Sequence, residues 1–443
     1  MRCQVRRAGP VTAHRVATGP VRARRVTLGP SRAGRVAARS ALALLVPAAL
    51  ALAGCGASSA TQAAGATSAP TAAAAAGRPT AIVAMGDGYL SGEGGRWEGN
   101  GAPMPTDRTC ARYPAGACPG YDSAAQHDPA QYHAWEQQIA KIYLPPSHAD
   151  GCDRSDTAEI SSSAIAVDQK INIACSGAST ANVIPAAQGG QARNGEASQA
   201  DQLAQIAKNY HIKMIVLSIG ADDLGLAAVL SGCTQDLPLR RGDCESGQRA
   251  AVNARTPQAL AAIERTIEGI RGVMTAAGYP VGSYLFVYQS YLSPIAAPAA
   301  NSVPETPQAR AAAGCPIDNL DEGWITGSLV PQVLDMQRQV AEDKDVVLLD
   351  LQRAGAGHEV CDKHTQRVSS RTPRVNPGTV EWFRAVQLRP RQGDIREFMH
   401  PNAIMQRALG RCLELLYAEN PAGSTDKFCT NTPGQGWTGM AVS

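Results

Sequence analysis

A glycine-rich turn directly after an apolar segment is the first place in this sequence where a ligand site is expected. Ala81–Met85 is an unbroken apolar run, long enough for one buried strand. Gly86-Asp87-Gly88 and Ser91–Gly95 follow, and they bring an acid, a hydroxyl and Glu93 into a sharp turn. Ligand sites of open α/β sheets form at the carboxyl ends of the strands. The pattern therefore predicts a site around Gly88, with Asp87 capping the next segment and Glu93 as an ordinary loop residue.

Three further blocks extend this pattern along the chain. They are Asn172–Ala178 (NIACSGA), Ser218–Asp223 (SIGADD) and Glu397–Asn402 (EFMHPN), with the phrase Gly357–Cys361 (GHEVC) before the last one. Together with the first turn, and in this order, they resemble the sequence blocks of the GDSL/SGNH ester hydrolases, in their secreted bacterial branch. The resemblance covers the whole domain, and it implies a doubly wound α/β fold and chemistry on ester bonds.

The resemblance also implies a role for single residues. The first block of the family reads roughly Gly-Asp-Ser, with the serine as nucleophile, and Gly88 stands at that position here. Gly177 corresponds to the glycine whose N–H serves the oxyanion hole, and Asp222 to the asparagine that donates its side-chain amide. His400 corresponds to the general base, and Glu397 to the acid three residues before it.

Two of these positions depart from the family in ways that oppose acyl transfer. A serine nucleophile needs both its hydroxyl and a base, and Gly88 has no side chain. Loss of such a serine typically costs on the order of 10⁶ in rate. An ionised Asp222 accepts hydrogen bonds and donates none, and a carboxylate about 4 Å from a developing oxyanion costs roughly 4 kcal/mol. The sequence therefore predicts a family site that has lost its acyl-enzyme chemistry.

Three functions compete on these grounds. The first is a binding protein for an acyl ester, a glycan or a cell-envelope component, which is the one we favour. The second is a hydrolase in which water enters the space at Gly88 and Asp222 or His400 acts as its base. The third is an ordinary esterase that uses Ser91. None of the three calls for a cofactor, and no cysteine pair has the Cys-x-x-Cys spacing of a zinc site, so no metal is expected.

The first 80 residues are predicted to precede the folded domain. Residues 1–54 are expected to be a signal peptide, because an Arg-rich start leads into the 14-residue apolar run Ala41–Gly54, which is too short to span a bilayer. Leu52-Ala53-Gly54-Cys55 matches a bacterial lipobox, which makes Cys55 the lipidated first residue of the mature chain. Residues 55–80 are rich in Ala, Ser and Thr and predict a flexible tether. We expect an exported protein held by lipid at the outer face of the membrane, with plain secretion as the alternative.

The charge of the chain sits mainly in this leader. The formal net charge is +3, but residues 1–54 hold ten Arg and no acid, so the remainder carries about −7. A basic surface for nucleic acid is therefore not expected. We expect a monomer whose partners are a small-molecule, acyl-ester or glycan ligand and, through Cys55, the membrane.

Ten cysteines remain beyond Cys3 and Cys55, an even number that suggests disulfides in an exported protein. Their order alone does not determine the connectivity. The family resemblance implies Cys152–Cys175, Cys233–Cys244 and Cys315–Cys361, and the simplest pairing of the other four is Cys110–Cys118 with Cys412–Cys429.

Alternating strand and helix patterns predict an α/β domain over residues 81–430 with a doubly wound, mostly parallel five-stranded sheet. The expected strands are Ala81–Met85, Lys170–Ala174, Lys213–Gly220, Ser283–Gln289 and Val346–Leu351. The expected helices are a patch around Gln131–Tyr143, then Gln199–Asn209, Thr256–Ala277, Trp324–Ala341 and Pro401–Tyr417, with Pro401 in the first turn. Residues 431–443 are expected to be a flexible tail.

Overall fold

The structure is a computed structural model that describes residues 77–97, 99–100, 143, 150–239, 242–367, 375–386 and 395–443. All of these belong to one compact unit, residues 66–443. The predicted signal peptide, the tether up to residue 76, Cys55, the helical patch before Tyr143, and the pair Cys110–Cys118 lie outside the described residues.

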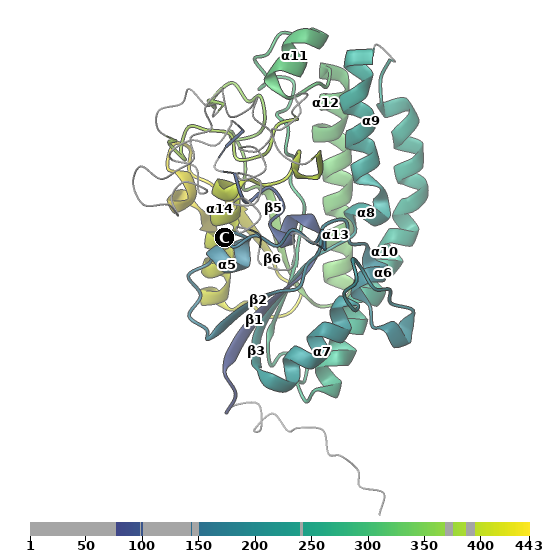
Figure 1. Ribbon diagram of the computed structural model, residues 1–443, viewed down its shortest axis with the longest axis vertical. Coiled ribbons are helices and arrows are strands. Elements are labelled where there is room, and N and C mark those ends of the chain that lie inside the picture. The colour runs from purple at the N-terminus through teal and green to yellow at the C-terminus, as the bar shows by residue number, and fades with distance from the viewer. Residues whose placement is uncertain are drawn as a thin grey trace, which may run out of the picture. The chain divides into compact units, whose positions relative to one another are not determined.

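A seven-stranded sheet forms the centre of the fold (Figure 1). Its order is β2-β1-β3-β4-β5-β6-β7; the strands run parallel except β7, which pairs antiparallel to β6. The strands are β1 (Thr80–Gly86), β2 (Gln169–Asn172), β3 (His211–Ser218), β4 (Leu285–Gln289), β5 (Val347–Arg353), β6 (Asp426–Thr430) and β7 (Ala441–Val442).

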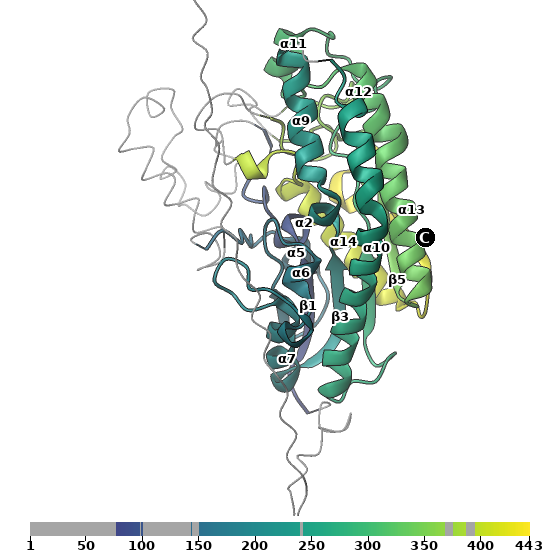
Figure 2. The same ribbon diagram turned by 90° about the vertical axis from the view of Figure 1, so that its right-hand side faces the viewer.

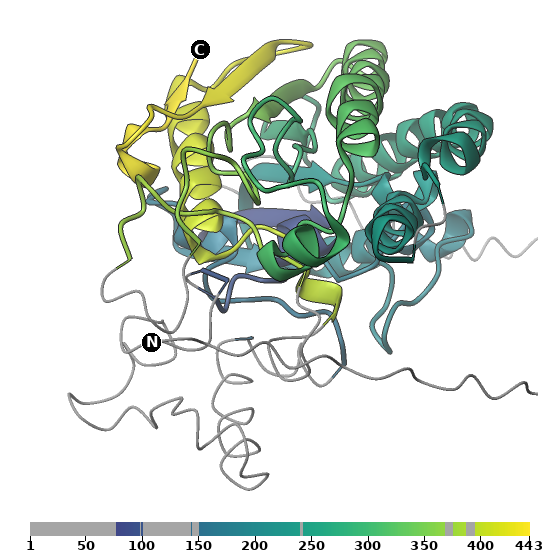
Figure 3. The same cartoon turned by 90° about the horizontal axis from the view of Figure 1, so that it is seen from above.

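Helices cover both faces of the sheet, and Figure 3 shows α14 on one side with α10 and α13 on the other. The α-helices are α2 (Gly88–Ser91), α5 (Glu159–Ser162), α6 (Thr180–Val183), α7 (Gln199–Asn209), α8 (Ala221–Leu224), α9 (Leu226–Leu239), α10 (Glu245–Ala276), α11 (Pro307–Ala313), α12 (Asn319–Trp324), α13 (Val330–Asp343) and α14 (Ala403–Glu419). A π-helical turn, η3 (Ile325–Leu329), joins α12 to α13, and 3₁₀ turns are found at η2 (Ala186–Gln188), η4 (Ile395–Glu397) and η5 (Gly436–Gly439). Among the described residues, no helix has the length and apolar character needed to cross a membrane.

The central strands are apolar on both faces because helices bury both faces of the sheet. Every residue from Ala81 to Met85 in β1 and from Met214 to Leu217 in β3 is fully buried. This is the continuous apolar pattern of a parallel sheet, which is why all five expected strands are found within a few residues of their predicted bounds.

The prediction of five strands was wrong by two: β6 lies at the end of the predicted domain, and β7 lies in residues 431–443, which were expected to be a flexible tail. β6 and β7 extend the sheet at its far edge, and the Cys412–Cys429 disulfide ties β6 to α14. β6, between β5 and the two-residue edge strand β7, has only one buried residue, Cys429, so it contains no apolar run. Its sequence therefore carries no strand signal of the kind that identified the inner strands.

Helix α14 begins two residues later than predicted. Asn402 is its N-cap, and the side-chain oxygen accepts from the N–H groups of Ile404 and Met405 at 3.0 and 3.3 Å. Pro401 therefore precedes the cap and is not in the first turn, because the asparagine side chain satisfies the first free N–H groups of the helix.

Four disulfides are present in the described part of the chain: Cys152–Cys175, Cys233–Cys244, Cys315–Cys361 and Cys412–Cys429. All four match the predicted pairing. The first lies beside the turn that follows β2, so it helps to place the residues of the candidate site.

Candidate active site

The predicted site residues meet at the carboxyl ends of β1, β2 and β3. β1 lies between β2 and β3 in the sheet, so the strand order reverses at β1. Open α/β sheets bind ligands at such a reversal. A cavity of about 270 Å³ opens at this point. Its lining includes Asp87, Gly88, Tyr89, Glu93, Ser176, Gly177, Arg193, Asp222, Tyr291, Arg396 and His400, together with apolar side chains from α9, η3 and α13.

Gly88 and His400 are brought together from opposite ends of the domain. A Cβ built on Gly88 would lie 2.8 Å from Nε2 of His400 and 2.7 Å from Oε2 of Glu93. The position of the missing nucleophile is therefore directly in front of the imidazole, as the resemblance implies. The end of β1 and the turn before α14 bring these two residues together, although they lie far apart in the sequence.

The imidazole of His400 is oriented by a backbone carbonyl. Its Nδ1 lies 3.2 Å from the carbonyl oxygen of Phe398, and with the hydrogen on Nδ1 the lone pair of Nε2 faces the cavity. The ring also packs against Tyr89, whose hydroxyl donates to the carbonyl of Met399 at 3.3 Å. Burial lowers the pKa of His400 more than the carbonyl of Phe398 and the charge of Glu397 raise it. At neutral pH the imidazole is therefore uncharged and able to accept a proton.

No hydrogen bond joins Glu397 to the imidazole in the described structure, so no contact supports the acid role predicted for Glu397. Its carboxylate is buried and accepts from Trp97 Nε1 at 2.9 Å, from Tyr143 OH at 2.7 Å and from Arg96, whose Nη2 lies 3.0 Å away. Burial by itself raises the pKa of Glu397, but Arg96 and its hydrogen bonds lower that pKa to about 2. The acid three residues before His400 anchors its loop, because its carboxylate bonds to Arg96, Trp97 and Tyr143.

Several backbone N–H groups at the cavity have no acceptor among the described residues, and two of them lie at the turns after β1 and β2. These two belong to Gly88, the first residue of α2, and to Gly177, which follows β2. Gly177 has a φ of +63°, and a side chain there would collide with the guanidinium of Arg193. A glycine is thus required at this turn by both conformation and space. The two N–H groups are the donors available for the oxygen of a bound carbonyl.

Asp222 lies at the cavity where the resemblance places an amide donor. Burial raises the pKa of Asp222, and Asp223 raises it further, while Arg193 opposes this. Arg193 donates to the carbonyl of Ser176 at 3.0 Å, so a cation that no sequence block indicated is fixed beside the oxyanion position. Asp223 instead accepts from the N–H and hydroxyl of Thr180 at 3.0 and 2.6 Å and caps α6.

Ser91 is not placed to act as an alternative nucleophile. Its side chain is fully buried, and its hydroxyl donates to the carbonyl of Gly88 at 3.1 Å and accepts from the N–H of Glu93 at 3.3 Å. It does not line the cavity. The hydroxyl instead stabilises the turn that follows β1.

Glu93 was expected to be an ordinary loop residue, and this prediction was wrong. Its carboxyl is buried, lines the cavity, and accepts from the hydroxyl of Ser176 at 2.6 Å. Oε2 lies 3.7 Å from Nε2 of His400. Burial raises the pKa of Glu93 well above its ordinary value, and the hydrogen bond from Ser176 only partly opposes this. The only signal in the sequence was its presence in the first block.

Asp87 caps α2, as predicted. One carboxylate oxygen accepts from the N–H of Tyr89 at 3.1 Å, and the other accepts from the hydroxyl of Tyr291. Burial raises the pKa of Asp87 to about 7, against the lowering effect of the Tyr291 hydrogen bond. Tyr291 in turn packs edge-on against Tyr89, so the capping group forms one wall of the cavity.

The far side of the cavity is apolar. Figure 2 shows the long helices α9, α10 and α13 running side by side next to the sheet, and α12 continues through η3 into α13. The π-helical turn η3 widens the helix by one residue, a distortion that is frequent at functional sites. The apolar side chains that line the cavity from these elements are Leu226, Val229 and Leu230 of α9, Ile325 and Leu329 of η3, and Val330 and Val333 of α13.

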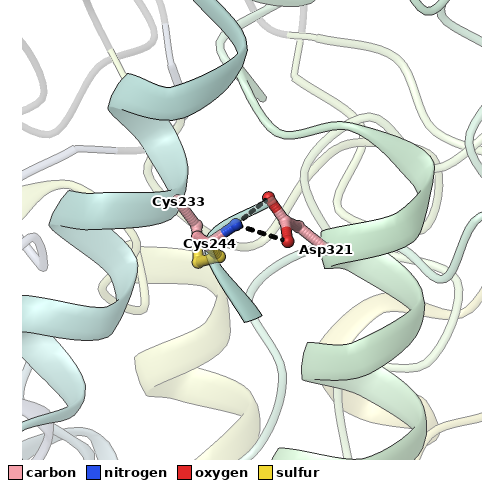
Figure 4. Close-up of side chains that lie close together, drawn as sticks. All are labelled: Cys233, Cys244 and Asp321. Carbon is pink, nitrogen blue, oxygen red and sulfur yellow. Dashed lines mark hydrogen bonds between the residues drawn. A yellow bond between two sulfur atoms is a disulfide. The ribbon is translucent and has the colours of Figure 1, made fainter. Parts of the chain in front are cut away.

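Within the described ranges, two clusters bring together side chains of the kind that bind metals, and in both the cysteine is part of a disulfide. Cys233 and Cys244 are joined in a disulfide, and Asp321 accepts from the N–H of Cys244 at 3.0 and 3.1 Å (Figure 4). This carboxylate caps the start of α10. In the second cluster, Asp150 and Glu196 flank Cys152, whose sulfur is bonded to Cys175. The sulfur atoms are consumed in both, so metal-binding thiolates are absent from these two places.

Comparison with known proteins gives structural neighbours only. No protein-family model matches the chain, and no curated protein matches it. The solved structures include an extracellular lipase from Streptomyces rimosus and phospholipase A1 from Streptomyces albidoflavus, each 18% identical, with a TM-score of 0.39, over 77% of this chain and 100% of the other. The aryl esterase of M. smegmatis matches with 12% identity, a TM-score of 0.31 and the same coverage. TM-scores this low establish no shared fold, so the assignment below rests on the sequence blocks and the geometry of the site.

Proposed function

We propose that this chain is an SGNH-hydrolase-like protein that binds an acyl ester without forming an acyl-enzyme. The observation that carries the proposal is the cavity itself. Two unpaired N–H groups, of Gly88 and Gly177, lie at one end, and apolar side chains line the other. Such an arrangement suits a carbonyl oxygen at the polar end and a hydrocarbon chain at the apolar end.

The absence of a nucleophile supports binding over the ordinary esterase route. Residue 88 has no hydroxyl, and the hydroxyl of Ser91 is buried in its own turn. The hydroxyl groups of the residues described at the cavity are all engaged: Ser176 donates to Glu93, Tyr89 to the carbonyl of Met399 and Tyr291 to Asp87. A glycan ligand is less well supported, because most of the cavity wall beyond the polar end is aliphatic.

The size of the cavity argues for a short or medium acyl group. At about 270 Å³ it lies at the lower end of the roughly 300–1,000 Å³ typical of small-molecule pockets. Hexanoyl or octanoyl esters are therefore the ligand class we propose, in place of long-chain glycerides.

Binding is tested with an ester analogue that water cannot readily cleave. N-ethylhexanamide should bind to the wild type in isothermal titration, and Val333→Trp should weaken binding at least tenfold by filling the cavity. Val281→Trp is the matched control, because Val281 is 62% exposed and does not line this cavity. A fluorophosphonate probe should leave the wild type unlabelled. Absence of amide binding, or equal loss in both variants, would contradict the proposal.

Export to the cell envelope forms part of the same proposal. Four disulfides are typical of proteins from oxidising compartments. The lipobox ending in Cys55, followed by the tether over residues 55–80, supports attachment at the outer face of the membrane.

A further inference from the structure

The carboxyl of Glu93 stands beside the place that a serine side chain would fill. Its Oε2 lies 2.7 Å from the Cβ position at Gly88 and 3.7 Å from Nε2 of His400. One water molecule about 2.8 Å from Oε2 of Glu93 and from Nε2 of His400 can donate a hydrogen bond to each of them. Because Gly88 has no side chain, the space for this water is open to the cavity.

The two carboxyl oxygens of Glu93 differ in their hydrogen bonding, and the water beside His400 would be held by Oε2 in addition to Ser176. Oε2 accepts from Ser176, whereas Oε1 is buried and has no hydrogen-bond partner among the described residues. An unsatisfied buried carboxyl oxygen costs about 1–3 kcal/mol or more, and such groups in native structures call for an explanation. The cavity is the direction from which a further partner can approach, since Glu93 lines it.

We infer that Glu93 and His400 hold and activate a water molecule in place of the missing serine, and that this water hydrolyses the acyl ester bound in the cavity. The inference rests on the proposed binding function and adds an activity to it. Of the two bases that the sequence offered, Asp222 and His400, it assigns the role to His400, and it adds Glu93 as the group that orients the water. No hydrogen bond joins Asp222 to His400 or Glu93 in the described structure.

The reaction balances with the groups present. His400 Nε2 takes a proton from the water as its oxygen attacks the ester carbonyl, and the carbonyl oxygen becomes an oxyanion at the N–H groups of Gly88 and Gly177. The ester C–O bond then breaks, and the imidazolium returns the proton to the leaving alcohol. Glu93, as carboxylate, orients the water and stabilises the imidazolium between these steps. The products are a carboxylic acid and an alcohol.

Burial and the neighbouring groups together set the pKa of Glu93. Asp153 and Glu397 disfavour its carboxylate, Arg396 and the hydroxyl of Ser176 favour it, and burial disfavours it most. Turnover should therefore rise with pH through a value above the ordinary range of a glutamate. Removing the Ser176 hydroxyl should move this rise to still higher pH.

The test compares turnover and binding in the same variants. Wild type should hydrolyse p-nitrophenyl hexanoate slowly, without an initial burst and without inhibition by fluorophosphonate. Glu93→Gln should reduce kcat by about 10²-fold or more, as expected for loss of acid–base assistance, while N-ethylhexanamide binds within twofold of wild type. Glu268→Gln, at a side chain 60% exposed, is the matched control and should change neither.

Each outcome has a distinct meaning. Turnover unchanged in Glu93→Gln, or a wild type that binds the amide yet stays at the background rate of hydrolysis, overturns this inference and leaves the binding proposal intact. A wild type that does not bind the amide overturns the binding proposal. Should Glu93→Gln not fold, Ser176→Ala replaces it, and a pH profile that does not move upward then counts against the role of Glu93.

Discussion

Nε2 of His400 lies 2.8 Å from the point where a Cβ on Gly88 would stand, so a side chain at residue 88 would meet the imidazole. Gly88→Ser would set a hydroxyl within reach of the imidazole. The new side chain would also press on Oε2 of Glu93, at 2.7 Å, but both contacts are with the ends of side chains that can shift. The backbone at residue 88 does not require glycine, because its φ is not in the left-handed region.

Gly88→Ser combined with Asp222→Asn should therefore create an ordinary serine esterase. The double variant should react with fluorophosphonate and should gain more p-nitrophenyl acetate turnover than the two single changes together. Nucleophile and oxyanion donor act on one transition state, so their effects are not additive. Adding His400→Ala should abolish the gain. A folded double variant that stays unlabelled would show that His400 is not positioned as a base.

Glu397→Gln should destabilise the protein in a pH-dependent manner. The pKa of Glu397 is lowered to about 2 in the folded state, against about 4.5 when unfolded. The ionised carboxylate thus stabilises the fold fully above about pH 4.5, and this contribution is lost as pH falls toward 2. We expect a loss of about 3 kcal/mol in the free energy of unfolding at pH 7, measured by urea denaturation, and a narrowing gap to wild type below pH 4. A gap that stays constant down to pH 2 would refute this account.

Removing the Cys152–Cys175 disulfide by Ser substitutions should affect both stability and the site. It closes a loop with a sequence separation of 23 residues, so its loss should cost about 2–4 kcal/mol. Amide binding should also weaken, because Ser176 and Gly177 follow Cys175 directly. The matched control removes Cys412–Cys429, with a separation of 17, which should cost similar stability and leave binding unchanged. Equal binding in both variants would show that the disulfide does not position the turn that contains Ser176 and Gly177.

Cys55→Ala should release the protein from the membrane. The proposed lipobox would make this cysteine the acceptor of the lipid chains, and two or more chains give lasting attachment. Cell fractionation with immunodetection should find wild type with membranes and the variant in the soluble exported fraction. A variant that remains with the membranes would disprove lipid anchoring at Cys55.

The sequence by itself determined the inner architecture and the position of several site residues. Apolar runs such as Ala81–Met85 can only be buried on both faces, so they identified the parallel strands, and the period of three to four residues identified α7 at its observed bounds. The blocks around Gly88, Gly177, Asp222 and His400 predicted residues that do line one cavity. This worked because the carboxyl ends of parallel strands meet at one edge of the sheet.

Only the tertiary structure decided which side chains complete the site. Glu93 is a turn residue by sequence, yet packing buries its carboxyl beside His400. Arg193 contacts the carbonyl of Ser176 from a loop that no sequence motif indicated. Glu397 has the spacing of a catalytic acid, but its carboxylate bonds to Arg96, and Nδ1 of His400 bonds to the carbonyl of Phe398. Spacing along the chain sets where a backbone atom can be. The direction of a side chain, and the charges that surround it, follow from the segments that fold against it.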